Sequence, residues 1–207
     1  MKWILAAAAL LFLLGGCVDS NGTARGVYVI ADFPAREEAP YGELEWLIKD
    51  VVGRLEPGDA FALERIDLGL SEGLRLDGRP SRAVAQKRAL LEQLDWLLSP
   101  SPVEAPGVGR DLVVAVDQGV GFLDSPGFGK RAVVLISDLR GARPTGLPTE
   151  LDGYRFFAIN ASQWPGGASD TWAYLRRIDD WQRAVESRGG EWRVIGLERE
   201  LTGTLLP

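Results

Sequence analysis

Apolar residues follow two alternating patterns along most of the chain. Short runs that are apolar throughout predict buried strands, and apolar residues spaced three or four positions apart predict amphipathic helices. Strands are predicted at residues 26–33, 60–67, 131–139, 154–161 and 191–198, with a hairpin or edge strand at 68–76. Helices are predicted at residues 41–55, 81–98, 111–123 and 170–188. Continuously apolar strands joined by helices predict a three-layer, Rossmann-like α/β fold, with a mostly parallel sheet and helices on both faces.

The same spacing predicts which side of each helix faces the core. The residues expected to point inward are Leu44, Leu47, Ile48, Val51 and Leu55 in the first helix, Val84, Leu91, Leu94 and Leu98 in the second, Leu112, Val116, Val120 and Leu123 in the third, and Leu175, Ile178, Trp181 and Val185 in the last. Ser81 and Asp111 stand where the N-caps of the second and third helices are expected.

The first 17 residues, MKWILAAAALLFLLGGC, form a separate pattern. Their apolar run is shorter than the roughly 20 residues that span a bilayer, and it matches the apolar part of an export signal. The ending Leu-Gly-Gly-Cys resembles the lipobox of bacterial lipoproteins. That resemblance implies cleavage before Cys17 and lipidation of its sulfur. The expected organisation is a signal peptide at 1–16, the lipidated Cys17 and a tether at 17–25, and one domain at 26–207.

Lipidation of Cys17 implies attachment to a membrane of the bacterial cell envelope. Stable anchoring needs at least two acyl chains, which a diacylglyceryl cysteine supplies. Val18, rather than an acidic residue, follows the cysteine. By resemblance to lipoprotein sorting signals, this favours the periplasmic side of the outer membrane if two membranes are present.

Charge and composition exclude several classes of chemistry. The net charge of −6 argues against binding to nucleic acid and against electrostatic docking on anionic lipid. The chain contains no histidine, so histidine-based triads, acid–base catalysis and zinc ligation are excluded in their usual forms. Cys17 is the only cysteine. Its lipidation leaves no thiol for a disulfide, a nucleophile or a metal cluster.

Three acidic residues stand where a parallel sheet places its functional crevice, at the carboxyl ends of the strands. Asp32 ends the first predicted strand, Asp111 opens the third helix, and Asp138 ends the central strand. Carboxylates that converge there suit a hard cation such as Mg²⁺ or Ca²⁺. The alternative is structural, with Asp32 and Asp138 paired to nearby arginines and Asp111 serving as an N-cap.

The order of these elements resembles that of a von Willebrand factor A domain. The resemblance rests on three runs of residues: GVYVIAD, GRD at the start of a helix, and RAVVLISDL. The resemblance covers roughly residues 26–196. In that family a divalent cation is held by an Asp-x-Ser-x-Ser turn, a Thr on a middle loop and the Asp that ends the central strand. Asp32 and Asp138 match the two aspartates. Pro34, Arg36 and Arg110 stand at the hydroxyl positions, so the resemblance implies a degenerate site that binds a cation weakly, if at all.

The resulting hypothesis is a lipid-anchored, non-catalytic envelope module that binds another envelope protein and uses no cofactor. The first alternative is a cation-dependent adhesion or assembly module that retains Mg²⁺ or Ca²⁺ through Asp32 and Asp138. The weaker alternative is a hydrolase that uses the aspartates. Trp164, on a loop that follows a predicted strand, is the candidate contact with a partner, because aromatic residues on loops often anchor interfaces. A tryptophan folded over the edge of the core is the other interpretation.

Overall fold

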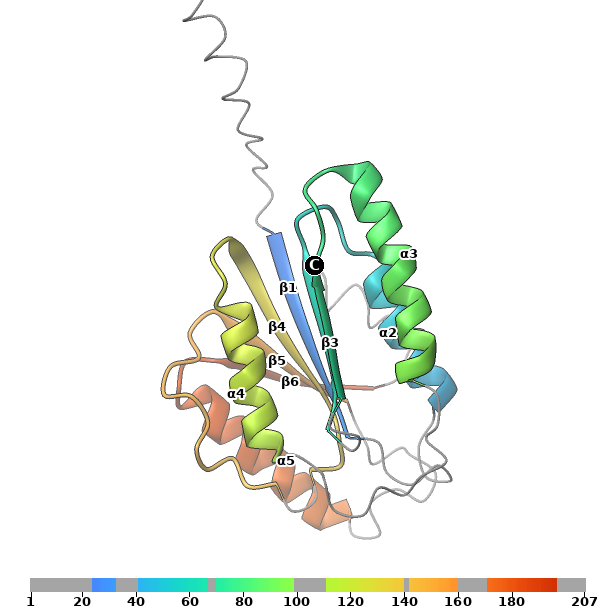
Figure 1. Cartoon of the computed structure of the whole chain (residues 1–207). Coiled ribbons are helices and arrows are strands. Elements are labelled where there is room, and N and C mark those ends of the chain that lie inside the picture. Colours follow the sequence, from blue (N-terminus) through green and yellow to red (C-terminus); the bar gives the residue numbers. More distant parts are fainter. Residues whose placement is uncertain are drawn as a thin grey trace, which may run out of the picture.

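Six strands form one sheet in the order β3-β2-β1-β4-β5-β6 (Figure 1). The computed structural model describes residues 24–32, 41–66, 70–98, 111–139, 142–159 and 171–196. The strands are β1 (Ala24–Ala31), β2 (Ala60–Arg65), β3 (Leu70–Arg75), β4 (Phe128–Ile136), β5 (Tyr154–Ile159) and β6 (Glu191–Ile195). Neighbouring strands are parallel except for the antiparallel pair β2–β3, which makes β3 the predicted edge strand.

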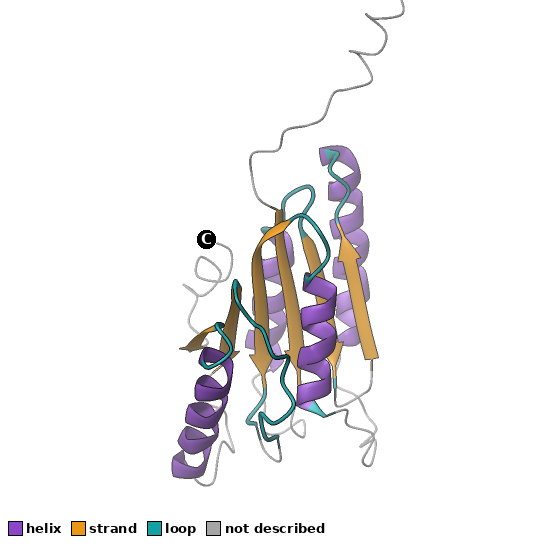
Figure 2. Ribbon diagram, turned by 90° about the vertical axis from the view of Figure 1, so that its left-hand side faces the viewer, coloured by secondary structure: helices purple, strands orange, loops and turns teal. Residues whose placement is uncertain are grey.

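The helices form one layer on each side of the sheet. They are α2 (Tyr41–Gly53), α3 (Pro80–Leu97), α4 (Leu112–Leu123) and α5 (Thr171–Glu186). Figure 2 shows α4 and α5 in front of the sheet, with α2 and α3 behind it. The predicted three-layer α/β fold is therefore confirmed, and the buried side chains of β1, β2, β4 and β5 form its core.

Strand boundaries differ from the prediction where hydrogen bonding extends beyond the apolar run. β1 begins at Ala24, inside the segment expected to be a tether, and β4 begins at Phe128, three residues before the prediction. The two extensions pair with each other, because Ala24 stands opposite Phe128 in the parallel ladder. Main-chain pairing does not require an apolar side chain, so hydropathy alone misses such ends.

Two details of the helices were predicted wrongly. Ser81 is not an N-cap: α3 begins with Pro80, and the preceding Arg79 provides no side-chain cap. Proline suits the first helical position because its φ is already helical and its missing N–H needs no partner there. Val84 and Leu175 are exposed, since the buried sides of α3 and α5 pass through Ala83 and Tyr174 instead.

Helix α4 packs closely on β1 because glycines remove side chains from the contact. A Cβ atom at Gly119 would lie 2.7 Å from Cδ1 of Tyr28, and one at Gly26 would lie 2.5 Å from Cδ2 of Leu123. These contacts place the end of α4 over the start of β1. The start of α4 therefore lies toward Asp32, at the opposite end of the strand.

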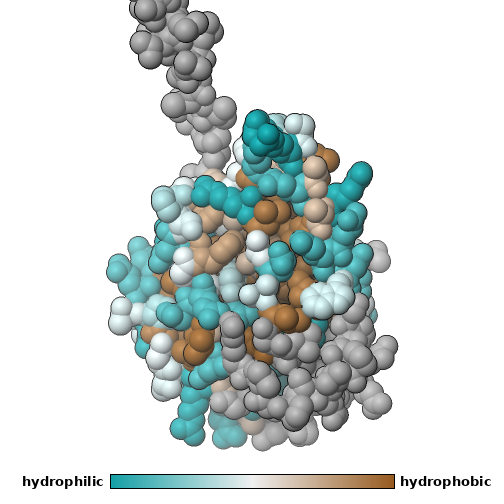
Figure 3. All heavy atoms as spheres, viewed as in Figure 1, coloured by the Kyte–Doolittle hydropathy of each residue, from teal (hydrophilic) through white to brown (hydrophobic). Residues whose placement is uncertain are grey.

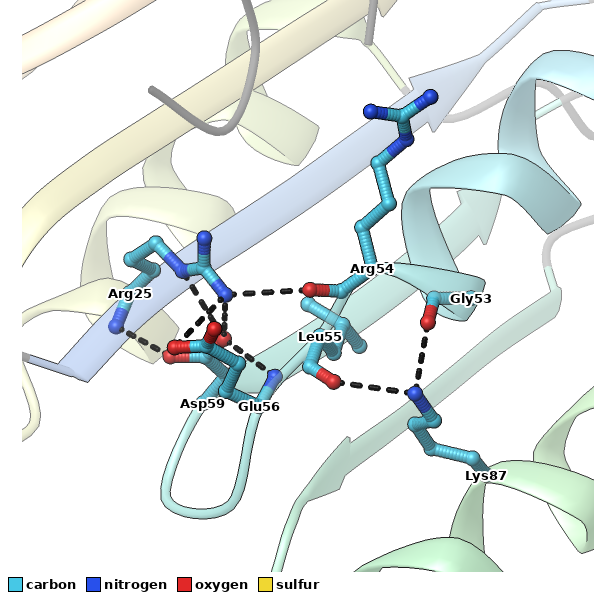
Figure 4. A network of polar contacts seen from close by, with 7 residues as sticks. All are labelled: Arg25, Gly53, Arg54, Leu55, Glu56, Asp59 and Lys87. Atoms are coloured by element: carbon cyan, nitrogen blue, oxygen red, sulfur yellow. Dashed lines mark hydrogen bonds and ion pairs between the residues drawn. The ribbon is translucent and has the colours of Figure 1, made fainter. Parts of the chain in front are cut away.

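A buried carboxylate joins the amino ends of β1 and β2 (Figure 4). Asp59 accepts hydrogen bonds from the backbone N–H of Arg25 (2.8 Å) and Glu56 (2.8 Å), and from Nε (3.0 Å) and Nη2 (2.7 Å) of Arg25. Nearby, the Lys87 ammonium donates to the carbonyls of Gly53 (2.7 Å) and Leu55 (3.1 Å), which ties α3 to the end of α2. This network fixes the point at which the chain enters the sheet.

Candidate functional site

The carboxyl ends of the parallel strands meet the starts of α4 and α5 at one edge of the sheet. We define this carboxyl edge as Asp32, residues 137–139 and the first turns of α4 and α5. The start of α5 is fixed there by two hydrogen bonds. Tyr174 Oη donates to the Ile159 carbonyl at 3.5 Å, and Arg177 Nε donates to the Asp138 carbonyl at 3.0 Å.

Asp32 and Ser137 join the ends of β1 and β4. The backbone N–H of Asp32 donates to the Ile136 carbonyl at 2.8 Å, and the Ser137 hydroxyl donates to Oδ2 of Asp32 at 3.1 Å. Ser137 Oγ in turn accepts the N–H of Leu139 at 3.0 Å. Leu139 has a left-handed φ of 59°, which is uncommon for a residue other than glycine. The serine hydroxyl thus stabilises a sharp turn immediately after the central strand.

The distance between the Ser137 hydroxyl and the Asp32 carboxylate is that of a nucleophile and its base, but a substrate cannot easily reach the serine oxygen. Ser137 is only 3% exposed, so a substrate has little room to approach its oxygen. The oxygen also accepts the Leu139 N–H, which reduces the electron density available for attack. The geometry therefore favours a structural role for this pair over hydrolysis.

Asp138 and Asp111 occupy different positions on the carboxyl edge. Asp138 is half-buried, and its carbonyl is held by Arg177. Asp111 is exposed and caps α4, because its Oδ1 accepts the N–H of Val113 at 2.9 Å. The expected N-cap role of Asp111 is thus confirmed.

The described carboxylates do not form the oxygen cluster that a hard cation needs. Within the described ranges, no group of three histidine, cysteine, aspartate or glutamate residues is arranged to hold a metal ion. The structure brings Asp32 and Asp138 to the ends of neighbouring strands, while the Asp111 carboxylate is used in its helix cap. The donor set is therefore a poor fit for Mg²⁺ or Ca²⁺, which take six or more oxygen ligands.

Several residues singled out in the sequence lie outside the described residues. They are the lipidation candidate Cys17, the candidate contact Trp164, and the residues at the degenerate cation positions, Pro34, Arg36 and Arg110.

A small pocket with two arginines opens beside Asp138. It has a volume of about 230 Å³ and is lined by Ala142, Arg143, Pro144, Arg177, Asp180 and Trp181. Arg177 also lies over the ring of Tyr174, 5.9 Å from its centroid. Asp180 contributes a carboxylate to the same lining and pairs with Arg183 at 2.6 Å. Arg177 could not be identified as a site residue from the sequence, because only the fold brings α5 to the end of β4.

Large apolar side chains are exposed at the starts of α4 and α5. Trp172 is 77% exposed, and Val114 and Leu175 are exposed as well. The predicted burial of Leu175 is therefore wrong, and Trp172 was not among the predicted contact residues. The signal was present in the sequence, since Trp172 falls outside the stripe formed by Tyr174, Ile178 and Trp181. Exposed aromatic and apolar side chains are common anchors of protein-binding surfaces.

No helix within the described residues has both the length and the apolar character needed to cross a membrane.

Comparison with known proteins identifies the fold. No protein-family model matches the chain, and no curated protein matches it. Among solved structures, one similar structure is an aerotolerance-related membrane protein from Bacteroides fragilis NCTC 9343, crystallised with multiple mutations to serines. The TM-score is 0.52 at 14% sequence identity, over 89% of this chain and 96% of that one.

A second similar structure is the conserved hypothetical protein BatB from Bacteroides thetaiotaomicron. Its TM-score is 0.51 at 11% identity, over 88% of this chain and 95% of that one. At these identities the likeness concerns the fold. The chain has the von Willebrand factor A-like α/β fold of these structures, with six strands in a mostly parallel sheet.

Proposed function

We propose that this protein is a lipid-anchored, non-catalytic module of the bacterial cell envelope that binds another envelope protein through its carboxyl edge. The observation that carries the proposal is the group of exposed apolar side chains at the starts of α4 and α5, Val114, Trp172 and Leu175. Apolar residues of this size are commonly the anchors of protein interfaces.

The direction of β1 supports this arrangement. The chain enters β1 at Ala24, and Asp32 follows its other end, so the carboxyl edge lies at the far end of the strand from any anchor. Six residues lie between Cys17 and Ala24, and the seven Cα-to-Cα steps that join them span at most about 25 Å. A lipid at Cys17 would therefore hold the domain near the membrane with its carboxyl edge directed away from it.

The similar Bacteroides fragilis structure belongs to a protein described as a membrane protein, which agrees with a location in the envelope. Val18 after the lipidated cysteine favours the periplasmic side of an outer membrane. The acidic net charge of −6 disfavours binding to nucleic acid.

The anchor is tested by replacing Cys17 with serine. We expect the wild-type protein to fractionate with membranes and to begin at a cysteine whose mass includes acyl chains. Cys17→Ser should leave uncleaved or soluble protein. A variant processed and membrane-bound like the wild type would contradict the anchor.

The binding edge is tested by photocrosslinking in intact cells. A photoreactive phenylalanine derivative is placed at Trp172, and the matched control carries it at Val84, an exposed apolar residue near the start of α3. We expect a discrete light-dependent adduct with an envelope protein at position 172 and none at 84. Equal labelling at both positions, or none at 172, would contradict the proposed edge.

One alternative retains an observation in its favour. Asp32 and Asp138 follow adjacent parallel strands, so both reach the carboxyl edge. A cation-dependent adhesion or assembly module would use these two carboxylates together with water, and its stability would depend on Mg²⁺ or Ca²⁺.

A further inference from the structure

The outer edge of β3 carries backbone groups that have no partner among the residues that the structure describes. Among the described strands, β3 pairs only with β2 and is the last strand of the sheet (Figure 2). The N–H of Leu76 donates to the carbonyl of the opposite residue Asp59 at 2.8 Å, which fixes the hydrogen-bonding phase of this antiparallel pair. Bonded and non-bonded pairs alternate along such a ladder. The backbone groups that bond to β2 are therefore those of Leu70, Glu72 and Leu74. The backbone N–H and C=O groups that point outward, away from β2, are those of Ser71, Gly73 and Arg75.

A groove lies alongside this edge, on the face covered by α3. Its volume is about 420 Å³, and it is lined by Leu70, Ser71, Glu72, Gln93, Trp96 and Leu97. Trp96 is 68% exposed, so its indole offers a large apolar surface beside the open strand. Figure 3 shows hydrophobic side chains at the surface in this region of the molecule, between the two helix layers.

The groove contains one unpaired charge. Glu72 is half-buried, and its carboxylate forms no ion pair or hydrogen bond with any residue that the structure describes. A half-buried carboxylate gains from an opposite charge, so an occupant that brings a lysine or arginine to this position is favoured.

A second copy of the chain cannot supply that charge. Two β3 strands related by a two-fold axis would pair antiparallel, and residues opposite each other would then lie on the same face. Glu72 would meet Leu70, Leu74 or the other Glu72, because the Arg75 side chain lies on the opposite face. Like charges opposite each other destabilise a sheet, so Glu72 disfavours self-association through β3.

We propose that the β3 edge accepts an extended segment of a partner protein as a seventh strand of the sheet. This segment carries a basic residue opposite Glu72 and an apolar residue, two positions away, that packs on Trp96. The outward backbone groups of Ser71, Gly73 and Arg75 supply the hydrogen bonds, and the groove supplies the selectivity. The inference concerns a different edge from that of the proposed function and depends on neither the carboxyl edge nor the lipid anchor.

The test uses the full chain purified in detergent and two end-blocked synthetic peptides. The first is Thr-Val-Thr-Lys-Thr-Val-Thr, and the second has glutamate in place of the lysine. We expect the lysine peptide to shift the amide resonances of Ser71, Gly73 and Arg75, and to bind about tenfold more tightly than the glutamate peptide. Glu72→Lys should reverse this preference, and Trp96→Ala should weaken both peptides.

Proline at position 71 tests the backbone directly. Ser71→Pro removes an outward N–H while the β2–β3 ladder is kept, and proline is tolerated at such positions of edge strands. We expect this variant to lose the peptide and the matched Ser71→Ala to keep it. Absence of binding at millimolar peptide, equal affinity for both peptides, or an unchanged preference in Glu72→Lys would overturn the proposal. Concentration-dependent protection of the same amides without peptide would overturn it in favour of a second copy.

Discussion

Asp32 and Ser137 lie 105 residues apart in the chain, and a hydrogen bond of 3.1 Å joins the serine hydroxyl to the aspartate carboxylate. This bond links the ends of β1 and β4, the two central strands. The same hydroxyl oxygen accepts the N–H of Leu139. One buried side chain therefore determines both the pairing of two strand ends and the path of the loop that follows.

Ser137→Ala should destabilise the fold. The substitution removes the acceptor of the Leu139 N–H and one donor to the Asp32 carboxylate, at a cost of about 1–3 kcal/mol in the free energy of unfolding. Urea denaturation measures this cost. The matched control is Ser81→Ala, at an exposed position of α3, with an expected change within about 0.5 kcal/mol. Equal effects of the two substitutions would show that the Ser137 hydroxyl contributes nothing specific.

Asp59→Ala should have a larger effect, because the Asp59 carboxylate accepts four hydrogen bonds and its loss leaves the Arg25 guanidinium without its buried partner. Removing one member of such a pair costs about 3–5 kcal/mol. The exposed pair Asp180–Arg183 provides the control, and Asp180→Ala should cost about 0.5 kcal/mol or less. A loss below about 1 kcal/mol for Asp59→Ala would contradict a structural role for this network.

Tyr154 should make stability depend on alkaline pH. Burial, and then the hydrogen bond that its hydroxyl donates to Asp124 (2.6 Å), raise the pKa of Tyr154 well above its ordinary value. Because the folded-state pKa is the higher one, the contribution is fully present below the unfolded pKa of about 10 and is lost as pH rises toward the folded pKa. The free energy of unfolding should therefore fall more steeply above pH 10 in the wild type than in Tyr154→Phe. Parallel pH profiles would contradict this.

Added divalent cations should change the melting temperature very little. Guanidinium groups at Arg36 and Arg110 stand at positions where the resembling family has hydroxyl ligands, so we expect a dissociation constant in the millimolar range or weaker. At a cation concentration equal to that constant, the stabilisation is RT ln 2, about 0.4 kcal/mol. Melting curves in EDTA and in millimolar Mg²⁺ or Ca²⁺ should nearly coincide. A rise of several degrees that Asp32→Ala abolishes would support the cation-dependent alternative instead.

The sheet was predictable from the sequence because burial on both faces makes each parallel strand apolar throughout. The run VVLI within β4 is an example, and every predicted strand and helix is present. The start of β1 was not predictable in this way, because Ala24 and Arg25 are held by pairing with β4 and by Asp59 rather than by apolar burial.

The candidate site was only partly predictable. Asp32 and Asp138 could be placed at one edge, since the carboxyl ends of parallel strands meet there. The contact of Arg177 with the Asp138 carbonyl joins residues 39 positions apart and follows only from the packing of α5. The exposure of Trp172 and Trp96 could be inferred from their positions outside the buried faces of their helices. The hydrophobicity of tryptophan by itself suggests burial instead.

The central claim, that the carboxyl edge binds another envelope protein, is tested most directly by replacing its apolar side chains. The measurement is the amount of envelope protein crosslinked to a photoreactive group at Val114 in the double variant Trp172→Ser/Leu175→Ser. Loss of a tryptophan anchor costs about 2 kcal/mol or more, so the adduct should fall at least about tenfold, and Val84→Ser should leave it unchanged. An adduct that persists at wild-type yield in the double variant would contradict the claim.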